Sequence, residues 1–172
     1  MAQVAVQSIW VIWLETTERA PTRVPMCELS PLLEEIVASG GTAELTVTGR
    51  SMEPMLHDRQ SRVRLRTAPE ALRRGDIALY RRDNGRYVLH RVAACRGGAY
   101  DFCGDAQWTL ECGLRRGQIL AVVTEFRRGE RWTPVENAAY GVYWRVLLAV
   151  RPVRRFAHRA AGWIRRRLKR NG

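Results

Sequence analysis

Residues 77–93, IALYRRDNGRYVLHRVA, decide the expected fold class. Two apolar runs rich in strand-forming residues, 77–80 and 87–93, are separated by the turn signal Asp83-Asn84-Gly85. On both sides of this stretch, short apolar or alternating segments continue the pattern that is typical of strands. These segments are residues 44–47, 63–65 and 119–126. Residues 43–133 are therefore predicted to form a compact, mainly β domain.

A short helix is expected before the β domain and a basic amphipathic helix after it. Ser30-Pro31 is typical of a helix start and Gly40-Gly41 of a helix end, and apolar residues at helical spacing lie between them. From Val153 onwards, a helical wheel gathers the apolar side chains into about 160° of arc, with arginines on the opposite side. The predicted organisation is an arm at 1–25, a domain at 26–136 and a basic helical tail at 137–172.

The arm at residues 1–25 is expected to be poorly ordered. It ends in a polar stretch that is broken by Pro21 and Pro25, which is typical of a linker. An alternative interpretation is that Met26 is the true start of translation and that the arm is not made.

Charge is concentrated at the C-terminal end of the chain. The 172 residues include 29 Lys and Arg and 17 Asp and Glu, a net charge of +12. Ten basic residues and no acidic one lie between Arg145 and Gly172, so residues 1–144 carry a net charge of only +2. A helix with arginines on one face and a wide apolar arc on the other favours peripheral attachment to an anionic membrane. Contact with nucleic acid and packing on the domain are the alternatives.

Compartment and cofactors are predicted from what the chain does not contain. No apolar run reaches the roughly 20 residues that a membrane-spanning helix needs, and the N-terminal stretch lacks the pattern of a secretory signal. We therefore expect the protein on the cytoplasmic side of a membrane, attached peripherally. The cysteines form no CxxC pair and have no histidine at metal-ligand spacing, so free thiols are expected, with no metal and no cofactor. They are Cys27, Cys95, Cys103 and Cys112.

Four short motifs carry the candidate chemistry. The first is Gly49-Arg50-Ser51-Met52-Glu53-Pro54, which places a serine in a turn just after a strand-like run. Such a serine usually only stabilises the turn by bonding its own backbone. It gains interest from the three motifs that follow it, which are Arg74-Gly75-Asp76-Ile77, Leu89-His90-Arg91-Val92 and Gly104-Asp105.

In this order and spacing, the four motifs resemble those of the signal peptidase superfamily, which also includes the self-cleaving LexA-type repressors. The resemblance covers about residues 44–125 and implies a LexA/signal peptidase-like β domain. Members use either a Ser/Lys or a Ser/His catalytic pair, and this chain has His90 at the position of the base. Lys169 is the only lysine, so the body of the chain offers no lysine base. The chain is thus similar to the histidine type found in the endoplasmic reticulum and in spore formers.

The resemblance assigns the catalytic residues, and elementary chemistry agrees with the assignment. A serine hydroxyl needs an adjacent base, and an imidazole with an ordinary pKa near 6.5 suits that task, so Ser51 is the expected nucleophile and His90 the base. An acid should hold the other imidazole nitrogen. Asp105 and Glu111 are the two candidates for this acid, and the choice stays open. His57 and His158 are expected to have structural or surface roles.

Substrate binding is also implied by the resemblance. Met52 and Gly49 are assigned to a groove in which an extended peptide adds to a sheet edge, with small residues favoured beside the cut. The Ser51 backbone N–H is the natural first donor to the oxyanion. Some relatives supply a second donor from a hydroxyl two residues before the nucleophile. That residue is Gly49 here, so any second donor must come from elsewhere.

The expected function is that of a serine endopeptidase cleaving a signal, leader or precursor peptide. One alternative is a LexA-type self-processing regulator, disfavoured because the lysine is missing and no helix-turn-helix pattern precedes Ser51. The other is a catalytically inactive, basic module that binds membranes or nucleic acid. It is disfavoured because Ser51, His90 and Asp105 are all present.

Overall fold

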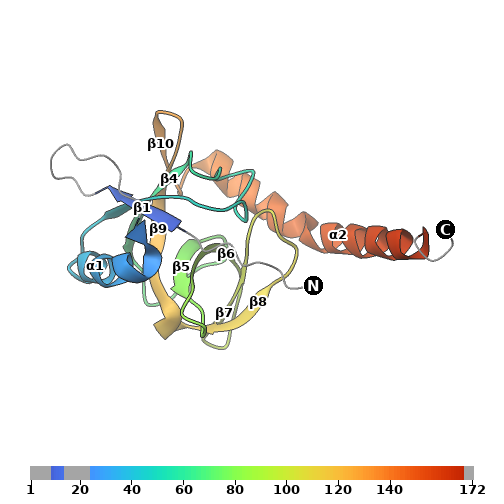
Figure 1. Cartoon of the computed structure of the whole chain (residues 1–172), viewed down its shortest axis with the longest axis horizontal. Helices are drawn as coiled ribbons and strands as arrows, with labels where there is room; N and C mark the ends of the chain where they lie inside the picture. The colour runs from blue at the N-terminus through green and yellow to red at the C-terminus, as the bar shows by residue number, and fades with distance from the viewer. Residues whose placement is uncertain (1–8, 14–23, 169–172) are drawn as a thin grey trace.

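The structure is a computed structural model that describes residues 9–13 and 24–168, with the burial of side chains for residues 30–154. It is mainly β, as the sequence predicts, with one helix near each end (Figure 1). The strands are β1 (Ile9–Trp13), β2 (Val24–Pro25), β3 (Ala43–Thr46), β4 (Arg62–Thr67), β5 (Ile77–Arg81), β6 (Tyr87–Arg96), β7 (Ala99–Cys103), β8 (Glu111–Arg115), β9 (Ile119–Arg128) and β10 (Arg131–Pro134). The helices are α1 (Met26–Ala38), the short 3-10 helix at Arg116–Gln118 and α2 (Ala138–Leu168).

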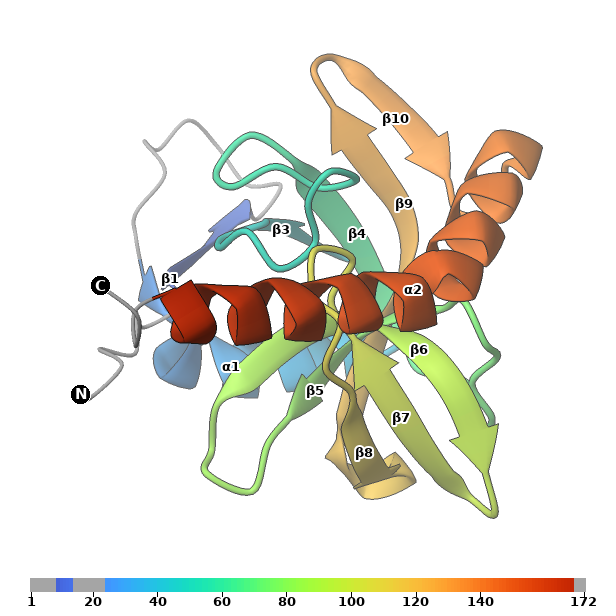
Figure 2. The ribbon, with the colours of Figure 1, turned by 90° about the vertical axis from the view of Figure 1, so that its right-hand side faces the viewer.

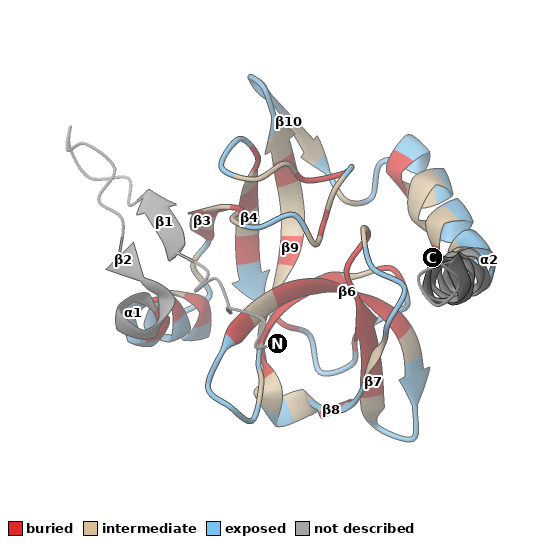
Figure 3. Ribbon diagram, turned by 45° about the vertical axis from the view of Figure 1, so that its right-hand side comes forward, coloured by how far each residue is buried: buried red, intermediate tan, exposed pale blue. Residues whose placement is uncertain are grey.

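All strand pairs of the described sheet are antiparallel. The order along the sheet is β2-β1-β3-β4-β9-β5-β6-β7-β8, and β10 forms a hairpin with β9. β5 lies near the centre and four of its five residues are buried, because both of its faces are covered. Buried residues also follow one another along β6 and β7 (Figure 3). Ile77 and Leu79 belong to one core, which contains the inner faces of β3 and β4, while Ala78 and Tyr80 belong to a second core with Phe102. The curled sheet thus has a packed core on each side.

The predicted strands at 44–47, 63–65, 77–80, 87–93 and 119–126 are all found as β3, β4, β5, β6 and β9, most of them longer than expected. β7 and β8 were not predicted. They extend the sheet beyond β6 and bring both candidate acids, Asp105 and Glu111, to this end of the molecule.

The first helix begins earlier than the sequence predicts. Helix α1 starts at Met26, so Ser30 is not its N-cap and Pro31 lies inside it. A proline is favoured at the first helical position, and inside a helix it removes one hydrogen bond and crowds the carbonyl four residues earlier, so the position of Pro31 is an unfavourable one. Leu33 and Val37 are buried in the first core and hold the helix on the sheet.

The first half of the C-terminal helix packs on the domain. Helix α2 begins at Ala138, one residue after the predicted start of the helical tail, and contains Pro152. Tyr140 and Leu148 are buried, and Tyr143 and Trp144 pack against the cores. The C-terminal half extends beyond the β domain (Figure 1), and the helix axis bends between the two halves (Figure 2). The side chains of residues 155–172, including the predicted amphipathic arc, lie outside the described residues.

Part of the N-terminal arm belongs to the sheet, which differs from the expectation of a poorly ordered segment. β1 pairs with β3, with Val11 opposite Thr46 and Trp13 opposite Glu44, and β2 pairs with β1. Residues 1–8 and 14–23 lie outside the described part of the chain.

Candidate active site

Ser51 lies in a tight loop that follows β3. Gly49 adopts a φ of +86°, a conformation that a side chain would strain, and donates its N–H to Asp58 Oδ1 at 2.8 Å. Met52 is buried in the first core and fixes the far side of the loop. The loop therefore holds Ser51 at a defined position with a partly exposed side chain.

The loop packs directly on the strand beside His90. The Ser51 carbonyl accepts the N–H of Ala106 at 2.9 Å, and a side-chain carbon on Gly104 would come within 2.5 Å of the same oxygen. Gly104 follows Cys103, which is paired with Arg91 across β6 and β7. Glycine is needed at 104 because the Ser51 loop approaches this strand end so closely.

His90 is buried, with 2 % of its surface exposed, and one of its ring nitrogens is held by two partners. Nδ1 lies 3.1 Å from the Tyr80 hydroxyl and 3.4 Å from Glu111 Oε1. A carboxylate can only accept, so the tautomer that suits this contact carries its proton on Nδ1 and has its lone pair on Nε2. Nε2 makes no hydrogen bond with any residue that the structure describes. Its free lone pair is what a general base requires.

Glu111 is anchored as a carboxylate. Arg82 forms a two-pronged contact with it, with Nε 2.7 Å from Oε2 and NH2 on Oε1. Burial acts to raise the pKa of Glu111, but hydrogen bonds from His90 and Arg82 outweigh it and lower that pKa to about 2. Burial and the nearby Glu111 charge raise the pKa of Tyr80, which keeps its phenol protonated. Glu111 is therefore negatively charged beside His90 at neutral pH.

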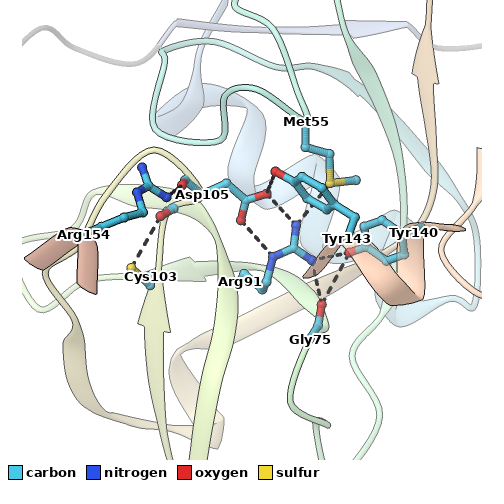
Figure 4. Close-up of polar contacts among 9 residues, drawn as sticks. Met55, Gly75, Arg91, Cys103, Asp105, Tyr140, Tyr143 and Arg154 are labelled. Atoms are coloured by element: carbon cyan, nitrogen blue, oxygen red, sulfur yellow. Dashed lines mark hydrogen bonds and ion pairs between the residues drawn. The ribbon is translucent and has the colours of Figure 1, made fainter. Parts of the chain in front are cut away.

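Asp105, the other candidate acid, is paired with Arg91 and not with His90 (Figure 4). The two side chains are fully buried and form a bidentate pair, with Nε–Oδ1 at 2.8 Å and NH2–Oδ2 at 2.6 Å. Burial opposes the charge of Arg91, but the hydrogen bonds to Asp105 outweigh it and raise the pKa of Arg91. Of the two candidate acids, only Glu111 contacts the imidazole.

Helix α2 completes the surroundings of this buried pair. Tyr143 donates its hydroxyl to Asp105 Oδ2 at 3.1 Å, and Arg91 NH1 contacts the Tyr140 hydroxyl (Figure 4). Further along α2, Arg154 donates to the Asp105 carbonyl oxygen at 2.9 Å. The helix thus holds the Gly104-Asp105 segment, and through it the wall on which the Ser51 loop rests.

A small hollow of about 40 Å³ opens beside Ser51. Its lining residues are Val47, Thr48, Ser51 and Met52, which follow β3, and residues 87–89 of β6. Met52 is thus placed at the expected groove. Gly49 is not among the lining residues, and its place in the structure is the turn described above.

Some predicted neighbours are not in contact. Within the part of the chain that the structure describes, no hydrogen bond joins Ser51 Oγ to His90. His57 lies elsewhere, with Nε2 3.4 Å from Arg128, and the side chain of His158 is outside the described residues. The sequence analysis did not identify Tyr80 and Arg82, whose types and positions give no signal before the strands are assembled.

Among the described residues, no three His, Cys, Asp or Glu side chains cluster as a metal site would require. Cys95, Cys103 and Cys112 are free thiols. No helix in the described part of the chain is long and apolar enough to cross a membrane. Comparisons with protein-family models, curated proteins and solved structures find no match for this chain.

Proposed function

We propose that this chain is a serine endopeptidase of the signal peptidase-like histidine type, with Ser51 as nucleophile and His90 as base, cleaving a signal, leader or precursor peptide. The observation that carries the proposal is the state of His90. Glu111 Oε1 lies 3.4 Å from Nδ1, and Nε2 is unpaired among the described residues. His90 lies on β6, which neighbours β7, and the Ser51 loop packs against the residues that follow β7. An imidazole with an acid at one nitrogen and no partner at the other is what a serine, histidine and acid group needs as its base.

The chemistry follows from these positions. When a peptide binds, Ser51 Oγ attacks the scissile carbonyl carbon and gives its proton to His90 Nε2, while Glu111 stabilises the imidazolium. The C–N bond then breaks, and His90 returns the proton to the leaving amine. A water molecule hydrolyses the resulting acyl-serine with the same base. The absence of a Ser51–His90 hydrogen bond before substrate binds is compatible with this scheme, because such contacts often tighten only in the complex.

The order of the motifs along the sheet also supports the family assignment. The serine follows β3, the histidine lies on β6, and the Gly104-Asp105 motif follows β7, with the three segments in mutual contact. Arg91, the residue after the base, is occupied in neutralising Asp105. In this proposal Asp105 is structural and Glu111 orients the base.

Attachment to an anionic membrane surface on the cytoplasmic side is a further part of the proposal. Exposed valines recur along the outer face of α2, at Val142, Val146, Val150 and Val153. Their spacing of three and four residues forms an apolar stripe, and no acidic residue follows Glu136. An apolar stripe beside arginines suits the boundary between lipid headgroups and acyl chains.

The competing function is an inactive binding module, and the missing Ser51–His90 contact is the observation that favours it. N-terminal proteomics of cells expressing the wild type or Ser51→Ala distinguishes the two. We expect new N-termini that appear only with the wild type, and these identify the cleaved peptide. Cleavage of the protein's own chain alone would indicate the self-processing alternative. Identical N-terminal profiles would contradict a peptidase function.

A further inference from the structure

Thr48, one of the residues that line the hollow beside Ser51, carries a buried hydroxyl that has no partner. Thr48 Oγ1 is the one buried side-chain nitrogen or oxygen in the described part of the chain that makes no hydrogen bond. Leaving a buried donor unpaired is unfavourable, and folded proteins pair nearly all of them. A buried hydroxyl without a partner is therefore unusual, and Thr48 lines the same hollow as Ser51, the proposed nucleophile.

A second unpaired donor lies on the same side of the hollow. Thr48 is three residues before Ser51 in the loop after β3, and both residues line the hollow opposite residues 87–89. The backbone N–H of Ser51 forms no hydrogen bond with any residue that the structure describes, whereas Gly49 between them donates to Asp58. Two donors without partners therefore belong to residues of the same loop, which line the same hollow.

We propose that the Thr48 hydroxyl is the second donor of the oxyanion hole, acting with the Ser51 backbone N–H. This inference rests on the proposed peptidase function. As Ser51 Oγ bonds to the carbonyl carbon, the carbonyl oxygen gains negative charge and accepts a hydrogen bond from each donor. The threonine keeps its proton throughout, and no bond to it forms or breaks. When the C–N bond breaks, the carbonyl is restored and both hydrogen bonds weaken.

The surroundings of the hollow make such a bond effective. Its walls include the apolar side chains of Val47, Met52 and Leu89, so few water molecules compete for the donors. Because the hydroxyl has no partner in the resting enzyme, it loses no hydrogen bond when it turns to the substrate. Gly49 has no hydroxyl of its own to offer.

The test uses the peptide identified by the N-terminal comparison above and two variants of Thr48. Thr48→Val keeps the shape and removes the donor, and we expect kcat to fall by about 10²- to 10³-fold with KM changed little. Thr48→Ser keeps the donor and should recover most of the lost turnover. Thr46→Val, the same change two residues earlier in β3, is the matched control and should retain wild-type kcat. A Thr48→Val enzyme with wild-type kcat would overturn the inference.

A stability measurement tests the inference without any substrate. An unpaired hydroxyl does not stabilise the resting protein, so Thr48→Val should unfold at the same or higher denaturant concentration than the wild type. Clear destabilisation of Thr48→Val but not of Thr48→Ser would show that the hydroxyl has a structural partner, and would overturn the inference. Failure of the proposed function is recognised separately, by full cleavage activity in Ser51→Ala.

Discussion

His90 has an acid beside one of its ring nitrogens, and in the proposed function it activates Ser51. Glu111 is charged at neutral pH and its Oε1 lies 3.4 Å from Nδ1, a position from which it can orient the ring. We predict that Glu111→Gln lowers kcat by about 10²- to 10⁴-fold, the usual range for loss of acid–base catalysis, while the protein stays folded. Steady-state kinetics and circular dichroism check this prediction. Wild-type kcat in Glu111→Gln would exclude Glu111 as the orienting acid.

Asp105 should respond differently, because its partner is the buried Arg91. Asp105→Asn leaves an uncompensated charge in the interior, and we expect it to lower the free energy of unfolding by about 3–5 kcal/mol. Denaturant unfolding of the wild type and the variant measures this difference. A stable Asp105→Asn protein with a specific loss of kcat would return the orienting role to Asp105.

Glu111 also makes stability depend on acid. The pKa of Glu111 in the folded protein is about 2, below its ordinary value of 4.5. The contribution of Glu111 to the free energy of unfolding is therefore fully present above pH 4.5. That contribution is lost as the pH falls from 4.5 towards 2. We therefore predict that the wild type loses more stability than Glu111→Gln over this interval, measured by denaturant unfolding at each pH. Equal losses in the two proteins would contradict the account of Glu111.

At the scale of single elements, α2 has a buried face and an exposed apolar face. Tyr140 and Leu148 face the domain, whereas Val142, Val146 and Val150 are exposed, Val142 by 63 % and Val146 by 55 %. We predict that changing these three valines to Gln weakens binding to vesicles containing phosphatidylglycerol by about tenfold, because their apolar contact with lipid is lost. Vesicle sedimentation measures the effect, and circular dichroism checks that the helix remains.

Leu32→Gln is the matched control for this experiment, since Leu32 is an exposed apolar residue on α1. It should bind vesicles as the wild type does. Unchanged binding by the triple valine variant would exclude the stripe as a lipid contact. A wild-type dimer that the triple variant converts to a monomer would show that the stripe binds a second copy instead. A variant that lacks the basic tail would test its share of vesicle binding. The deletion should begin at residue 155, so that the contact of Arg154 with the Asp105 carbonyl is kept.

The central strands could be predicted because their local sequence patterns are strong. Strand β8 and the start of α1 could not, because their local patterns are weak or misleading. β5 and β6 consist of apolar runs on both sides of a clear turn. β8, in contrast, reads Glu-Cys-Gly-Leu-Arg, with Leu114 as its one buried residue, so no periodicity marks it. The start of α1 was misplaced because Ser30-Pro31 is a common helix start, whereas here the helix already begins at Met26.

At the scale of the whole molecule, assembly of the sheet decides which residues of the site meet. Ser51 and His90 could be proposed from their motifs, but the choice of acid depends on the pairing of β6, β7 and β8. That pairing places Cys103 opposite Arg91 and Glu111 opposite Phe102, and no local pattern contains it. The same holds for Arg82, which reaches Glu111 from the turn after β5. The contact of α2 with Asp105 likewise appears only when the chain is folded.

The central claim is that Ser51 and His90 act as one catalytic unit, and a double-mutant cycle on the identified peptide tests it most directly. The measurement is kcat/KM for the wild type, Ser51→Ala, His90→Ala and the double variant, with His57→Ala as the control histidine. We predict that each single variant loses nearly all activity, that the double variant is little worse than either, and that His57→Ala is unaffected. A His90→Ala protein with wild-type kcat/KM, or losses that multiply in the double variant, would contradict the account.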